Sequence, residues 1–272
     1  MIAPFFKLAA LSPTRRSAFL RVLAAHLALL LAAIFVMRRM HAAAALQLLG
    51  NLVLVAGIVE GALLLGWRLA QMPKSQALEF LFVSSLRPAR IILSEACVGL
   101  AQLGFVTLSG LPALALLASD GAIDLFDIWP LLTLPFTWGA ITGIGLTVWA
   151  YEPPFIRRWG ERLMICLIIL YLLIGVLAGE HLKRWLDALP ASLAGGLLQC
   201  FAVFHTHNPF GVMRWWLEND FVVGWPRTVF MEVVSLALLS ILLIRAAWRL
   251  QGHFHERHYQ PALLDKGKTR PL

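Results

Sequence analysis

The sequence predicts an all-α, polytopic membrane protein with six transmembrane helices. Of its 272 residues, 60% are hydrophobic and only 14% are charged, whereas soluble domains carry about 25% charged residues. Six apolar runs supply, or nearly supply, the roughly 20 residues that a helix needs to cross the bilayer. Tryptophans such as Trp67, Trp149 and Trp248 fall near the ends of these runs, where indole rings prefer the membrane interface. One transmembrane domain is therefore expected over residues 1–250, followed by a basic tail over 251–272.

An amphipathic segment precedes the first span. Phe5, Phe6 and Leu8 are expected at the headgroup boundary as an interfacial helix, and Lys7 and the absence of a small-residue cleavage pattern argue against a removed signal peptide. Ser12-Pro13 is typical of a helix start. The six spans are expected at about residues 18–37, 42–65, 91–118, 128–149, 163–179 and 229–244.

A seventh apolar run, residues 189–204, is shorter and contains Pro190 and Gly195-Gly196. If it crossed the bilayer, the two termini would lie on opposite sides. We therefore expect a broken, re-entrant hairpin before the last span, which is tolerated only where protein or water surrounds the backbone.

The distribution of Lys and Arg predicts that both termini are cytoplasmic. With six spans, the basic residues concentrate in the two termini and in the loops that include Arg68 to Arg90 and Arg157 to Arg162, and Arg38-Arg39 is the exception on the other side. Cytoplasmic loops of membrane proteins carry such an excess. The net charge of +8 is thus explained by topology and by contact with anionic membrane lipid, and nucleic acid is not an expected partner.

The segment between the second and third spans is charged and bracketed by prolines. A helix over about residues 74–85 places Leu78, Phe82 and either Leu81 or Ser85 on one face by the spacing rule for amphipathic helices. Arg87-Pro88 should end it, because the residue before a proline avoids the helical conformation. A short surface helix between two spans can transmit a push, or it can lie in the interface as a lipid anchor. We expect the first role.

Several short stretches of this segment resemble the permease subunits of ABC transporters of the ABC-2 (type V) class. The matching residues are Gln76-Ala77-Leu78-Glu79, Phe80-Leu81, Ser84-Ser85-Leu86-Arg87-Pro88 and Ile91-Ile92. The layout of an interfacial helix, six spans and a broken hairpin is also similar to that family. The resemblance implies a coupling helix that contacts a cytosolic ATPase through Leu78, Glu79, Phe80, Phe82, Ser85 and Arg87.

The same resemblance implies partners and a location. It implies a second permease protomer, identical or not, a bacterial-type cytoplasmic (inner) membrane, and export of an amphipathic or lipid-linked substrate. The chain has no G-x-x-x-x-G-K-[ST] motif to hold nucleotide phosphates. We therefore expect no cofactor on this chain and no catalysis by it, with ATP and Mg bound by the partner ATPase.

Polar residues inside the spans are candidates for a substrate pathway or for contacts between helices. Glu60, Asn51 and Gln102 are the main ones; Glu60 lies between Gly57 and Gly61, and its two roles are equally favoured, because intramembrane carboxylates are expensive yet often paired. Outside this set, we expect Glu95 to pair with Arg90 on the surface, and Glu232 to extend towards the outer interface.

Metal binding is not expected. His253, His255 and His258 form an H-x-H-x-x-H pattern, but nothing fixes their geometry and they suit a solvated tail near anionic lipid. Cys97, Cys166 and Cys200 show no paired spacing and are expected to be buried small hydrophobic residues.

Two other functions remain open from the sequence. The chain could be a multi-span enzyme acting on lipid, with His205 or His207 as base and Asp120, Asp124 or Asp127 nearby, although no compact catalytic signature is visible. It could also be a structural anchor or assembly factor that holds soluble partners through its basic tail.

Overall fold

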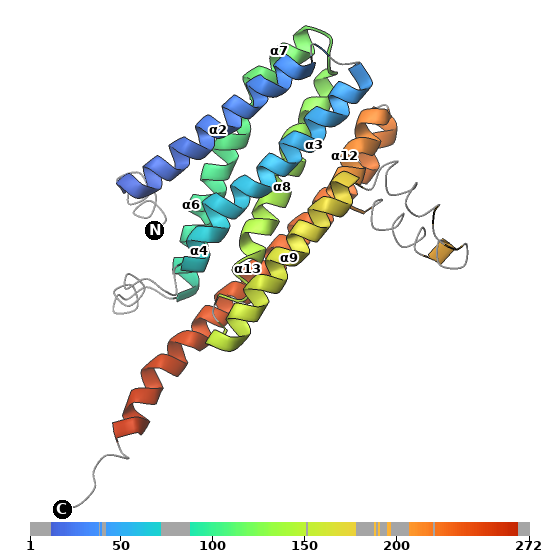
Figure 1. Ribbon diagram of the computed structural model, residues 1–272. Coiled ribbons are helices and arrows are strands. Elements are labelled where there is room, and N and C mark those ends of the chain that lie inside the picture. Colours follow the sequence, from blue (N-terminus) through green and yellow to red (C-terminus); the bar gives the residue numbers. More distant parts are fainter. Residues whose placement is uncertain are drawn as a thin grey trace, which may run out of the picture.

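A computed structural model describes residues 12–37, 39, 42–71, 88–150, 152–177, 188, 190, 195–196, 207–219 and 221–265. All regular structure within these residues is helical, as the sequence predicts. The helices lie side by side in one bundle (Figure 1). They are α2 (Pro13–Met37), α3 (Ala42–Gly61), η1 (Ala62–Gly66), α4 (Trp67–Gln71), α6 (Pro88–Ser109), α7 (Leu111–Ser119), η3 (Leu125–Asp127), α8 (Ile128–Gly145), α9 (Pro154–Leu177), α12 (Pro209–Glu218) and α13 (Phe221–Asp265).

Four helical stretches of the described chain are long and apolar enough to cross a membrane. They are Pro13–Met37, Ala44–Ala70, Arg90–Ser119 and Phe221–Leu250. Large apolar side chains such as Leu31, Phe105 and Ile244 face outward, and contiguous exposed apolar surface of this kind is typical of a membrane or protein interface. The fold is therefore that of a membrane protein.

The predicted spans can be compared with these helices. The ranges 18–37, 91–118 and 229–244 fall within three of the candidate spans, and 42–65 overlaps the span Ala44–Ala70 except for its first two residues. The ranges 128–149 and 163–179 largely coincide with α8 and α9. The predicted interfacial helix, the segment 74–85 and nearly all of the hairpin 189–204 lie outside the described residues.

The helix ends follow local chemistry. As predicted, α2 begins at Pro13, and the amide of Arg16 donates to the carbonyl of Ser12 at 3.0 Å. The third candidate span is interrupted between α6 and α7 at Gly110, and Pro112 occupies the first turn of α7, where a missing amide hydrogen is tolerated. The last helix, α13, does not end near residue 250, where the predicted tail begins, but continues to Asp265 and projects from the bundle (Figure 1).

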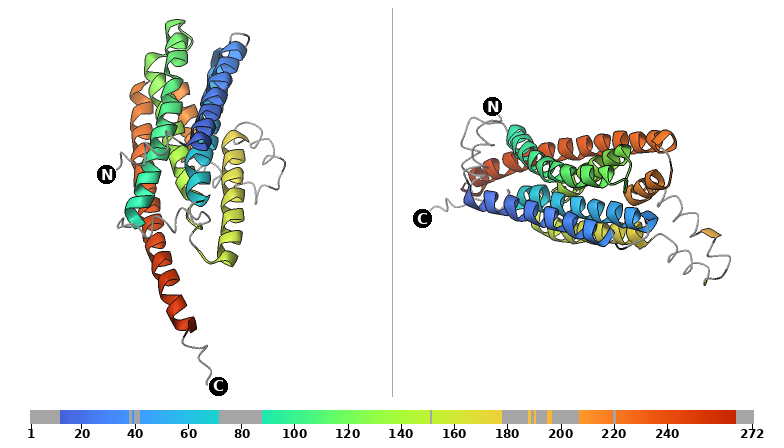
Figure 2. Two further views of the ribbon diagram at one scale, coloured as in Figure 1. Left: turned by 90° about the vertical axis from the view of Figure 1, so that its left-hand side faces the viewer. Right: turned by 90° about the horizontal axis from the view of Figure 1, so that it is seen from above.

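The centre of the bundle is α8, which contacts α3, α6, α12 and α13. Seen from above, α2 and α3 lie on one side of the bundle, while α6 and α13 lie on the other (Figure 2). We call the end that holds Arg68, Glu95 and Glu152 the lower end, and the end that holds Asp127 and Trp216 the upper end. Each end has its own cluster of buried apolar side chains.

The tightest helix contact joins α3 to α8 through small residues. A Cβ atom built on Gly57 would lie 2.6 Å from the Cβ and the carbonyl oxygen of Pro135, and one on Gly61 would collide with the backbone of Gly139. Membrane helices approach closely where Gly residues repeat every fourth position, and Gly57/Gly61 faces the matching pair Gly139/Gly143. Because Gly57 and Gly61 face α8, Glu60 between them faces a different neighbour of α3.

Two cysteines lie among the described residues and differ from expectation. Cys97 is half-buried in α6, but Cys166 is exposed on α9, so the prediction that it is buried is wrong. A thiol is a small apolar group that the surrounding hydrocarbon of a membrane tolerates as well as a protein core does.

Candidate functional site: buried charges between the helices

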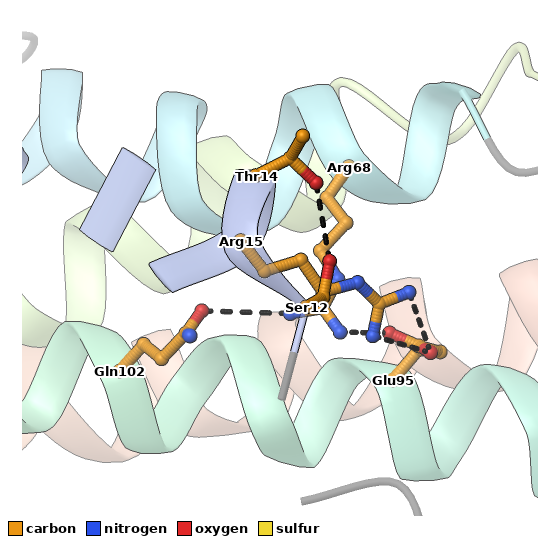
Figure 3. Close-up of polar contacts among 6 residues, drawn as sticks. All are labelled: Ser12, Thr14, Arg15, Arg68, Glu95 and Gln102. Carbon is orange, nitrogen blue, oxygen red and sulfur yellow. Dashed lines mark hydrogen bonds and ion pairs between the residues drawn. The ribbon is translucent and has the colours of Figure 1, made fainter. Parts of the chain in front are cut away.

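A buried carboxylate at the lower end joins three helices. Glu95 of α6 is 6% exposed. One of its oxygens lies 3.4 Å from Nη2 of Arg15 on α2, and the other forms an ion pair with Arg68 on α4. Arg68 also donates to Oε1 of Gln102 at 3.4 Å (Figure 3). These four residues, which we call the lower charge cluster, connect α2, α4 and α6.

The position of this cluster along the chain is informative. Arg68 lies in the last turn of α4, which ends at Gln71, and Glu95 lies near the start of α6, which begins at Pro88. The Arg68–Glu95 ion pair therefore ties together the two helices that flank residues 72–87. All six residues expected to contact an ATPase fall in that interval and lie outside the described residues.

The predicted environment of Glu95 is wrong. A surface pair with Arg90 was expected from the spacing within one helix, but Glu95 is buried and pairs with arginines of two other helices. Sequence spacing detects neighbours on the same helix, whereas Arg15 is 80 positions away in the chain. The available signal was that Arg68 and Glu95, of opposite charge, flank the same loop.

A second buried pair lies deeper between α2 and α3. Nδ1 of His26 is 2.8 Å from Oε1 of Glu60, and these residues are 4% and 6% exposed. Glu60 thus makes a contact between helices, and the pathway role, which was equally favoured, stays a prediction. Its Oε2 has no hydrogen-bond partner within the described part of the chain. His26 was not among the sequence candidates, although a histidine within one apolar run and a glutamate within the next suggested such a pair.

The helix geometry places both charge sites on one side of α2. Arg15 and His26 are 11 residues apart, slightly more than three turns of about 3.6 residues, so they share a face. Glu60 and Arg68 are separated by the π-helical turn η1. In an uninterrupted α-helix, eight residues would rotate the second side chain about 80° past two full turns. The extra residue of a π turn removes most of that rotation, so Arg68 can face α2 and α6.

Two further polar residues, one on α3 and one on α13, can be placed. Asn51 lies half-buried on α3. Glu232 was expected to extend to the outer interface beside Arg227, but it is half-buried and faces α8, where Thr137 donates to it at 3.5 Å. This prediction is wrong because α8 offers hydroxyl groups at the same depth as the carboxylate.

A second carboxylate at the lower end connects the α8–α9 connection to α13. Oε1 of Glu152 forms ion pairs with Nη2 of Arg249 at 3.0 Å and with Nη2 of Arg245 at 3.7 Å. The Glu152 side chain is 8% exposed. The sequence assigned both arginines to the basic region that follows the last span. In the structure these arginines hold α13 against this connection, at the same end of the bundle as the lower charge cluster.

The upper end carries the aspartates considered for an enzyme. Asp127 accepts a hydrogen bond from Nε1 of Trp216 at 2.9 Å. Burial raises the pKa of Asp127, although its hydrogen bonds from the Asp124 amide and Trp216 oppose this. Asp124 and Asp127 line a cavity of about 300 Å³, whereas His207 lines a different one.

The remaining candidates from the sequence are His205 and the possible metal ligands. His205 lies outside the described residues. Within the described parts of the chain, no group of three or more His, Cys, Asp or Glu side chains gathers in a geometry that could hold a metal ion.

No protein-family model, curated protein or solved structure matches this chain.

Proposed function

We propose that this chain is the membrane-spanning permease subunit of an ATP-driven ABC transporter of the ABC-2 class. In this proposal α8 and α9 complete six spans together with the four candidate spans, and residues 74–85 form a coupling helix on the cytoplasmic side. A separate subunit binds ATP and Mg and hydrolyses the nucleotide. The observation that carries the proposal is the lower charge cluster, which braces the two helices on either side of the expected coupling helix.

The cluster gives a physical route for force. A displacement of residues 74–85 would act first on Gln71 and Pro88, where the flanking helices end and begin. The Arg68–Glu95 ion pair would keep α4 and α6 moving together, and Arg15 would pass the displacement to α2. Packed helices transmit such motion because a close-packed interior yields little. A loop that only anchored lipid would not need a buried charge network behind it.

The proposed transport direction and assembly follow from the resemblance and the outer surface. We propose export of an amphipathic or lipid-linked molecule by a dimer of permease protomers. Apolar side chains such as Leu31, Phe35 and Leu20 are exposed along α2, and this surface suits contact with lipid or with the second protomer. Both termini would be cytoplasmic, with the lower end of the bundle facing the cytoplasm.

The first test is the sidedness of the coupling segment. A cysteine is placed at Ser84 in a chain whose Cys97, Cys166 and Cys200 are replaced by alanine. A membrane-impermeant maleimide should label it in inside-out vesicles and leave it unlabelled in right-side-out vesicles or intact cells. Labelling from the outside only would refute the proposed topology.

The second test is capture of the ATPase. The tagged chain, purified from the membranes of its source cell, should bring down a protein with ATPase activity, and Phe82→Asp should abolish this. The matched control is Phe155→Asp, because Phe155 is also at the lower end and is 74% exposed at the start of α9. Equal capture by wild type and Phe82→Asp would contradict the coupling role.

A further inference from the structure

A cavity of about 380 Å³ lies among α8, α12 and α13. It is lined by Trp138 of α8, by Val212 of α12 and by one face of α13 between Arg227 and Leu238. Its volume is in the range of about 300 to 1,000 Å³ that is usual for small-molecule sites. It shares no residue with the lower charge cluster, so it is a separate feature of the fold.

The lining changes from cationic to apolar along α13. Arg227, Met231, Val234 and Leu238 follow each other at intervals of three or four residues, and this stripe covers about 16 Å of helix. Arg227 is near the start of a helix that is long enough to span a membrane. The cavity therefore has the polarity of an amphiphile, with its cationic end towards the helix start and its apolar end deeper.

Two buried hydrogen-bond donors in the cavity wall lack partners. Ser235 is 2% exposed, and neither its Oγ nor Nε1 of Trp138 has a hydrogen-bond partner among the residues that the structure describes. Other hydroxyls of α13 are satisfied: Thr228 donates to the carbonyl of Gly224 at 3.1 Å, and Ser240 to that of Leu236 at 2.8 Å. Buried polar atoms are nearly always paired, and an indole N–H can only donate. Acceptor atoms of a ligand in the cavity would satisfy these groups.

We propose that this cavity binds a monoacyl glycerophospholipid, with its phosphate at Arg227 and its ester carbonyl at Ser235 and Trp138. A guanidinium is suited to a phosphate because it donates two parallel hydrogen bonds. Arg227 and Ser235 are about 12 Å apart along the helix axis, and the long arginine side chain covers part of that distance. The acyl chain continues past Val234 and Leu238. This site does not depend on the chain being a permease.

Photolabelling of the purified full-length chain in detergent tests the site. The probe is lysophosphatidylglycerol with a diazirine in its acyl chain, and labelled peptides are identified by mass spectrometry. Labelling should saturate and map to α8 and to residues 227–238. Three competitors test which chemical group is recognised. Monoacylglycerol, which lacks the phosphate, should compete about tenfold less well than unlabelled probe, and dodecyl phosphate, which lacks the ester, should compete about threefold less well. Inorganic phosphate should not compete.

Substitutions assign the contacts. Arg227→Gln should weaken apparent affinity about tenfold and Ser235→Ala about threefold, whereas Ser235→Leu should fill the cavity and abolish saturable labelling. Ser240→Ala on the same helix and Arg39→Gln at the other side of the bundle are the matched controls and should bind as wild type. Each variant is used only if it elutes at the same volume as the wild type in size-exclusion chromatography. If Ser235→Leu does not, the affinity of Ser235→Ala alone tests the role of Ser235.

Three results would overturn the proposal. One is wild-type affinity in both Arg227→Gln and Ser235→Ala. Another is labelling spread evenly over exposed helices such as α2 and α9. The third is equal competition by monoacylglycerol, which would remove the phosphate from the recognised group.

Discussion

Neutralising Glu95 is the most direct perturbation of the lower charge cluster. Glu95→Gln keeps the shape of the side chain but leaves Arg15 and Arg68 facing each other without a carboxylate. Breaking a buried ion pair by removing one partner costs about 3 to 5 kcal/mol. The Arg15 side chain is 35% exposed and can keep part of its hydration, while that of Arg68 is only 16% exposed. We therefore expect the lower limit, about 3 kcal/mol.

The assay is thermal unfolding of the detergent-purified protein. At about 2 °C per kcal/mol for a chain of this size, Glu95→Gln should lower Tm by about 6 °C. The matched control is Glu218→Gln, because Glu218 pairs with Arg214 at 2.7 Å on the exposed face of α12. Exposed pairs contribute about 0 to 1 kcal/mol, so this control should shift Tm by no more than about 2 °C.

A double substitution separates charge from packing. Arg68→Met combined with Glu95→Leu removes the two more buried members and should be more stable than Glu95→Gln alone, because the only charge left without a carboxylate is Arg15, whose side chain is 35% exposed and keeps part of its hydration. The reasoning is refuted if Glu95→Gln shifts Tm no more than Glu218→Gln does. It is also refuted if the fall in Tm of the double variant equals the sum of the falls in Arg68→Met and Glu95→Leu measured separately, since the effects of substituting residues in contact should not be additive.

Three other predictions concern different parts of the fold. His26→Leu should lower Tm by about 6 °C because Glu60 loses its partner, and adding Glu60→Leu should recover most of this loss, so a double variant less stable than the single one would contradict the pairing. Gly61→Ala should lower Tm by several degrees because the new Cβ collides with the α8 backbone, whereas Gly145→Ala, which meets nothing within 4 Å, should change Tm little. For Asp127, the folded pKa lies above the unfolded value of about 4, so the protein should lose stability as pH rises through the interval between the two values. The slope of Tm against pH in that interval should become smaller in Asp127→Asn, and an unchanged slope would assign it to other groups.

The fold class was readable from the sequence because apolar runs of spanning length leave few alternatives to helices. The approach of α3 to α8 was readable only in part, since the spacing of Gly57 and Gly61 indicates a face for close contact but does not identify the matching Gly139 and Gly143 on α8. The partners of Glu95 and Glu60 could not be read, because they come from helices that are distant in the chain. Local spacing favoured Arg90 and left Glu60 undecided. The depth of Glu232 could not be read either, because its partner Thr137 lies on α8, 95 positions away in the chain.

The unbroken length of α13 has a consequence for reach. Residues 251–265 continue the helix beyond the candidate span Phe221–Leu250 and add about 22 Å at 1.5 Å per residue. The polar layer on each side of the hydrocarbon is only about 5 to 8 Å thick. A rod of this length is long enough to pass from the end of the candidate span through the phospholipid headgroups, so that a water-soluble protein could meet its tip without touching the bilayer.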